Sequence, residues 1–190
     1  MDYNIVVAVI SLLISAASLG YTIIKNRKTD VLRMKVEKVQ LDVLQASKLY
    51  NNVKEVKREF EKSLSTLVVL NNGELTEKQD LNVAFLDAYN KYTDFYNEIN
   101  DYCIMVNIGA INAEDYIKNT IAVNLSKYAK MQYETFSCLQ GIASQNQFKS
   151  ISKPDYDAFK DYDAFLKKYN GENSVFWMNL KTERRNAGFE

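Results

Sequence analysis

The residues whose types could do chemistry are few, and the most suggestive of them close the chain, in the run RRNAGFE from Arg184 to Glu190. The 190 residues include no histidine, which removes Ser/His and Cys/His nucleophilic sites, histidine-ligated metals and a histidine pH switch. Most familiar hydrolytic chemistry is thereby excluded, and the sequence predicts no metal site and no cofactor. Arg184 and Arg185 also fit an ordinary helix end, where basic charge is favourable to the helix dipole.

Two further sets of reactive side chains have simple structural interpretations. Cys103 and Cys138 fall in predicted helices and are too few for a metal site, so we predict small buried side chains in a reducing compartment. The sequence DYDAF occurs at residues 155–159 and again at residues 161–165. On a helix its four carboxylates do not converge as a calcium site requires, so we predict a solvated acidic face.

Composition indicates the elements that must position these residues. Apolar residues make up 47% and charged residues 25%, with one proline and six glycines, which predicts an all-α chain. The length of 190 residues allows one domain, or one small domain plus an accessory segment. The net charge is zero, but residues 25–62 carry +5, residues 74–116 carry −7 and residues 117–190 carry +3. Such blocks indicate helices paired by charge, within a subunit or between subunits, and no direct nucleic-acid binding.

The first segment is uncharged. Residues 5–24 lack any charge, and about 20 helical residues span the ~30 Å hydrocarbon core of a bilayer, so we predict a transmembrane helix. A cleaved signal peptide is the main alternative, but the chain begins Met-Asp-Tyr-Asn without a basic region. Basic residues follow the segment, which predicts a single-pass protein of the inner (cytoplasmic) membrane with its N-terminus out and its body cytoplasmic. The predicted domains are residues 1–28, the anchor, and residues 29–190, a cytoplasmic helical bundle.

Small and hydroxylated residues form a stripe on this segment, because they recur at alternating spacings of three and four. The stripe consists of Ala8, Ser11, Ser15, Ser18 and Thr22. In lipid such a stripe is the usual contact surface between helices. Two alternatives are a lone anchor whose hydroxyls bond to carbonyls of their own helix, and a stripe that lines a polar lumen.

The same spacing of apolar residues continues from Leu32 to Leu67 and predicts one long helix that ends at Asn71-Asn72-Gly73. A second helix is predicted from a capping box at residues 76–79, with an aromatic stripe that faces the core. A third helix should end at Gly141, a fourth should open at Ser152 and Pro154, and a short one should cover residues 174–185. The stripe of the second helix is Phe85, Tyr89, Tyr92, Tyr96, Ile99, Cys103 and Val106.

From Arg185 onward the tail resembles the RNxxxH signature of HEPN domains, which are small helical bundles and often RNases. Arg185 and Asn186 match the signature, and Glu190 stands where the family has histidine. One membrane helix followed by a divergent HEPN-like body also resembles the membrane accessory proteins of type VI-B CRISPR systems. That resemblance implies an oligomeric membrane assembly that supports antiviral defence beside an RNA-guided RNase, with a pore as the proposed mechanism.

The departure at Glu190 matters chemically. In active members of the family histidine assists proton transfer and arginine stabilises developing charge at the scissile phosphate. A carboxyl with a usual pKa of ~4.3 has no proton to donate at pH 7. We therefore predict no catalytic residue and a non-enzymatic protein that forms homo-oligomers in the lipid bilayer, as a pore or membrane-perturbing ring. The alternatives are a membrane-tethered HEPN-type RNase and a plain scaffold that recruits a partner to the membrane.

Overall fold

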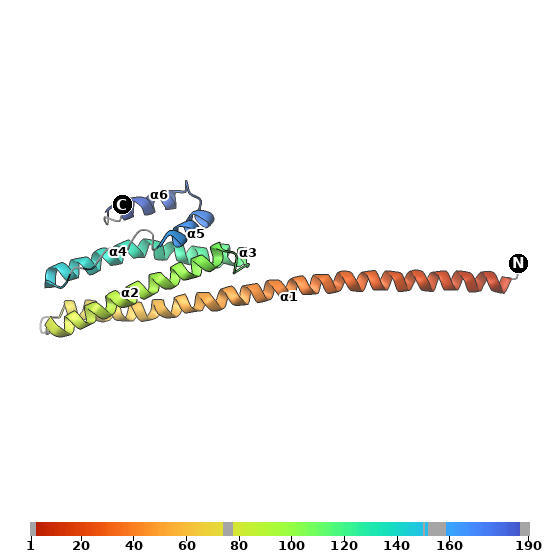
Figure 1. Ribbon diagram of the computed structural model, residues 1–190, viewed down its shortest axis with the longest axis horizontal. Coiled ribbons are helices and arrows are strands. Elements are labelled where there is room, and N and C mark those ends of the chain that lie inside the picture. The colour runs from red at the N-terminus through yellow and green to blue at the C-terminus, as the bar shows by residue number, and fades with distance from the viewer. Residues whose placement is uncertain (1–2, 74–77, 150, 152–158, 187–190) are drawn as a thin grey trace. The chain divides into compact units, whose positions relative to one another are not determined.

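The computed structural model describes residues 3–73, 78–149, 151 and 159–186, without the side chains of residues 3–14, 16, 17 and 79. All secondary structure in this described part is helical, as the composition predicted (Figure 1). The elements are α1 (Tyr3–Asn71), α2 (Lys78–Asn107), α3 (Glu114–Tyr116), the π-helix η1 (Ile117–Ile121), α4 (Ala122–Asn146), α5 (Lys160–Asn170) and α6 (Val175–Asn186). Two compact units divide the chain, Met1–Asp42 and Val43–Glu190.

One part of the predicted fold class is wrong. The sequence predicted a transmembrane helix over residues 5–24, but among the residues that the structure describes no helix is long and apolar enough to cross a membrane. Beyond that segment, α1 carries charged side chains at short intervals from Lys25 to Asp42, and charge at the bilayer centre is costly. The side chains of residues 1–14, 16 and 17 lie outside the described part of the structure.

The second unit is a helical bundle with an aromatic core. Ring contacts from Phe60–Phe95 to Tyr50–Tyr102 join the C-terminal part of α1 to α2, and α4 packs on α2 (Figure 1). Phe60 of α1 stacks on Phe95 of α2, with ring centroids 5.7 Å apart and an interplanar angle of 16°. The aromatic stripe predicted for α2 is confirmed as core, with Tyr89 partly buried at its margin. The fully buried members are Phe85, Tyr92, Tyr96, Ile99, Cys103 and Val106.

Tyrosine hydroxyls attach α4 to its neighbours. Tyr92 donates to the carbonyl of Gln132 at 3.2 Å, and Tyr96 donates to the carbonyl of Tyr128 at 3.0 Å. Tyr162 of α5 donates to the carbonyl of Leu125. Because a buried hydroxyl without a partner costs about 1–3 kcal/mol, these bonds let large rings enter the core with their polar ends satisfied. Burial raises the pKa of Tyr92, Tyr96 and Tyr162 above its usual value, so all three keep their protons.

The helix ends agree only in part with the sequence predictions. The end of α1 at Asn71 is confirmed, whereas Gly141 does not end α4, which continues to Asn146. A helical glycine costs about 1 kcal/mol, and the buried Ile142 and Ala143 keep this turn in the bundle. The helix ends instead where Gln147 adopts a left-handed conformation at φ 55°. The predicted starts at residues 76–79 and 152–154 lie outside the residues that the structure fully describes.

The two cysteines have different environments. Cys103 is fully buried in α2, as predicted, and burial raises the pKa of its thiol well above the usual value. Cys138 is exposed, so its predicted burial is wrong. The physical reason is its position on α4, between Phe136 and Leu139, which occupy the inward face of the helix.

Candidate functional site

Arg185 and Asn186, the first residues of the tail whose resemblance to the HEPN signature was noted in the sequence, lie in the last turn of α6. Arg185 and Asn186 are both exposed there, while Glu190 lies outside the described residues. A groove of about 300 Å³ beside this turn is lined by Tyr133, Glu134, Ser137, Glu183 and Asn186. Its two carboxylates would repel a phosphate, so this groove does not fit a nucleic-acid backbone.

The neighbouring residue, Arg184, occupies a very different environment. Its side chain is 4% exposed, and its guanidinium makes a bidentate pair with Asp163 of α5, one arm being Nη1 to Oδ2 at 2.6 Å. The Nε atom donates to the hydroxyl of Tyr133 on α4. The guanidinium carbon also lies 5.5 Å from the ring centroids of Tyr133 and Trp177. Arg184 thus links α4, α5 and α6.

Electrostatics assign this cluster a structural role. Burial lowers the pKa of Arg184, but hydrogen bonding and charge from Asp163 and Tyr133 outweigh burial and raise the pKa above its usual value. A guanidinium that stays protonated and is already paired does not act as a general acid or base at neutral pH. Its donors point at Asp163 and Tyr133, so the cluster holds the C-terminal helices together and offers no acid or base.

Asp163 corrects a prediction. The second DYDAF copy was predicted to form a solvated acidic face, but Asp163 is only 5% exposed. It shares the inward face of α5 with Tyr162 and Leu166. The spacing of three between Asp163 and Leu166 places both on one side of a helix and could have indicated this from the sequence. Its partner Arg184 is distant in the sequence, and no local pattern could reveal the pair. Residues 155–158 of the first copy lie outside the described residues.

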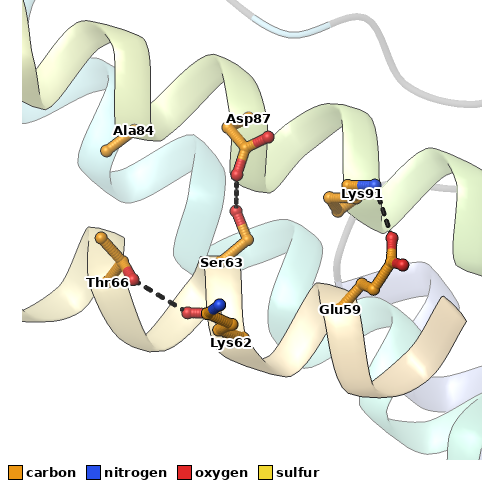
Figure 2. Close-up of a pocket in the computed structure, with 7 residues that line it drawn as sticks. All are labelled: Glu59, Lys62, Ser63, Thr66, Ala84, Asp87 and Lys91. Atoms are coloured by element: carbon orange, nitrogen blue, oxygen red, sulfur yellow. Dashed lines mark hydrogen bonds and ion pairs between the residues drawn. The ribbon is translucent and has the colours of Figure 1, made fainter. Parts of the chain in front are cut away.

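A polar groove lies between α1 and α2, with a volume of about 360 Å³. Figure 2 shows two interhelical contacts that close it: Lys91 Nζ lies 2.6 Å from Glu59 Oε2, and Ser63 Oγ donates to Asp87 Oδ2. Its lining carries as many lysines as carboxylates. The lining residues are Glu59, Lys62, Ser63, Thr66, Ala84, Asp87 and Lys91.

The chemistry of this groove is limited. The hydrogen bond and charge from Lys91 lower the pKa of Glu59, and those from Glu59 raise the pKa of Lys91, so both groups stay ionised. Ser63 has a carboxylate as its partner, and an ordinary carboxylate is too weak a base to generate an alkoxide at neutral pH. No cluster of possible metal ligands occurs among the described residues. The groove therefore sets the register of α1 against α2.

The predicted stripe of the first segment is described only in part. Ser15, Ser18 and Thr22 are exposed, whereas the side chains of Ala8 and Ser11 lie outside the described part. Thr22 Oγ1 donates to the carbonyl of Ser18 at 2.8 Å. This bond matches the alternative in which hydroxyls bond to their own helix.

A feature that the stripe did not cover is the set of large apolar side chains on residues 19–41 of α1. In the sequence, Leu32, Val36 and Val39 continue the spacing that places Ala46, Tyr50 and Val53 in the core. Yet these three residues are 54–62% exposed. Ten such side chains are between 46% and 70% exposed: Leu19, Tyr21, Ile23, Ile24, Val31, Leu32, Met34, Val36, Val39 and Leu41.

The chain matches no protein-family model, no curated protein and no solved structure.

Proposed function

We propose that this chain is a non-enzymatic helical protein that assembles with copies of itself through residues 19–41 of α1. The observation that carries the proposal is the exposure of ten large apolar side chains on this segment. Exposed apolar surface of this density on one element is typical of an interaction site. The heptad-like spacing of Leu32, Val36 and Val39 is the spacing that helices use to pack against another helix.

The chemistry of the candidate sites agrees with a non-enzymatic role. Arg184 is committed to Asp163, the α1–α2 groove neutralises its own charges, and Glu190 cannot replace a catalytic histidine. A role in antiviral defence beside an RNA-guided RNase rests on the resemblance of the tail and the layout, and it stays a prediction.

The first test is the mass of the full chain in solution. The wild type is expected to exceed the monomer mass of 21.9 kDa, and Val36→Asn with Val39→Asn should return it towards that value. Each buried valine contributes about 1.5 kcal/mol or more, so losing two weakens association by roughly 100-fold. Light scattering over a concentration series measures the change.

The control is Gln40→Asn, which introduces the same side chain at an exposed polar position of the same helix. It should leave the mass unchanged. A wild type that stays at 21.9 kDa at every concentration would contradict self-assembly, as would a valine double variant that assembles normally.

The second test is RNA cleavage. We expect the purified protein to leave single-stranded RNA intact at the rate of the buffer alone, because the chain has no histidine for proton transfer. Gel analysis of a labelled RNA measures this. Reproducible cleavage that Arg185→Ala abolishes would instead establish the RNase alternative.

A further inference from the structure

We propose that assembly is head to tail: the basic part of α1, residues 25–42, of one copy binds a column of carboxylates on α2 in a second copy. The inference rests on the proposed self-assembly and specifies its geometry. Two surfaces of opposite charge and similar length carry it.

The acidic surface is a column of carboxylates on α2. Asp80, Asp87, Asp94 and Asp101 recur every seven residues and are all exposed, so they follow one side of the helix. Of these four, Asp87 accepts a hydrogen bond from Ser63 at the edge of the α1–α2 groove. Lys91 lies four residues after Asp87 and three before Asp94, so one basic side chain, paired with Glu59 of α1, interrupts the column. Among the described residues, Asp80, Asp94 and Asp101 make no salt bridge. Burial first, and then the charge of Asp101, raise the pKa of Glu98, the carboxyl three residues before Asp101.

Apolar side chains accompany the column. Val83 and Leu86 are 61% and 48% exposed. Val83 lies three residues after Asp80 and four before Asp87, so it shares their side of α2. A surface that combines acid with exposed aliphatic groups fits a basic helix with its own apolar stripe.

Residues 25–42 of α1 have that composition. They carry six basic and three acidic side chains, a net charge of +3. The ion pair described within them, Arg33 with Glu37, is exposed by 78% and 55% and contributes little. At about 1.5 Å per residue this segment is ~26 Å long, and the column from Asp80 to Asp101 is ~32 Å long. The two surfaces can therefore lie along each other over most of their length.

Charge favours contact between α1 of one copy and α2 of another over contact between two α1 segments or two α2 helices. Two copies of residues 25–42 would bring +3 against +3, and two α2 columns would bring acid against acid. Opposite charges on different surfaces of one chain favour contact between unlike surfaces of two copies. When each copy uses its two surfaces on two different neighbours, the interface is heterologous and propagates into rings or filaments. We expect masses beyond the dimer, and weaker assembly at high salt.

The experiment reverses the charges separately. One variant carries Lys28→Glu and Lys35→Glu. These changes keep the exposed apolar side chains of residues 25–42 and the Arg33–Glu37 ion pair. The other carries Asp94→Lys and Asp101→Lys, which spare Asp87. Each variant alone should assemble at least about tenfold more weakly than the wild type, because its reversed side chains then face charges of their own sign on the other surface. An equimolar mixture should regain wild-type assembly, since each altered surface meets a complementary one on the other variant.

The matched control carries Glu114→Lys and Glu172→Lys, two exposed carboxylates outside the column. It changes the net charge by the same amount as Asp94→Lys with Asp101→Lys and should assemble normally. Normal assembly of both charge variants, or no rescue on mixing, overturns the head-to-tail mode. If Val36→Asn with Val39→Asn still abolishes assembly in that case, self-assembly stands and only its geometry fails. A monomeric wild type overturns both proposals.

Discussion

Arg184→Met is expected to destabilise the fold by about 3–5 kcal/mol, because it leaves the carboxylate of Asp163 buried without its partner. Asp163 is 5% exposed and Arg184 4%, so water cannot replace the lost guanidinium without opening the α4–α5–α6 contact. Urea unfolding followed by circular dichroism measures the loss as a lower midpoint with an unchanged slope.

A paired substitution separates the charge from the packing. Asp163→Leu combined with Arg184→Met removes both charges, and apolar replacement of a buried ion pair is often neutral or stabilising. The double variant should therefore be more stable than Arg184→Met alone. Arg185→Met, one residue along on the exposed side of α6, should change stability by less than about 0.5 kcal/mol. Equal midpoints for Arg184→Met and the wild type would contradict the structural role assigned to this cluster.

Phe95→Ala is expected to cost about 3–5 kcal/mol, since it opens a cavity at the centre of the aromatic core. Phe95 is 0% exposed, and its ring centroid lies 5.7 Å from that of Phe60, 4.8 Å from Tyr96 and 5.4 Å from Tyr128. The ring thus joins α1, α2 and α4, and no small shift of one helix can fill the space. Thermal and urea unfolding measure the effect.

Val123→Ala is the control for this cavity, because Val123 is 52% exposed on α4 and its truncation leaves no internal space. Its expected change is below about 0.5 kcal/mol. A similar loss for the two variants would mean that the aromatic cluster is not the centre of the core.

The sequence predicted most of the helical bundle because its signals are local. The spacing of three and four in α2, from Phe85 to Val106, placed the aromatic side chains on one face, and the structure confirms their burial. The end of α1 at Asn71 was predicted from the turn residues that follow it. The predicted end of α4 at Gly141 is wrong, because the low helix propensity of glycine is a weak signal. The buried residues that follow Gly141 in α4 outweigh it.

The candidate sites were harder to predict, because chemistry depends on which distant residues meet. The tail pointed to Arg185, but the buried arginine is Arg184, whose partner Asp163 lies on another helix. The acidic repeat that predicted a solvated face therefore supplies one partner, Asp163, of a buried ion pair. The absence of charge in residues 5–24 likewise predicted a transmembrane helix. In the described part of the chain no helix is long and apolar enough to cross a membrane.

By itself the sequence determined which residues are apolar, which are charged and at what period, and this indicates where the helices lie and which faces they can bury. Only the tertiary structure decided which faces find a neighbour within the chain. Ala46, Tyr50 and Val53 are buried in the bundle, whereas Leu32, Val36 and Val39, at the same spacing on the same helix, are exposed. The physical reason is that periodicity records the surface that a helix can bury, while burial requires a second surface whose position the local sequence does not encode.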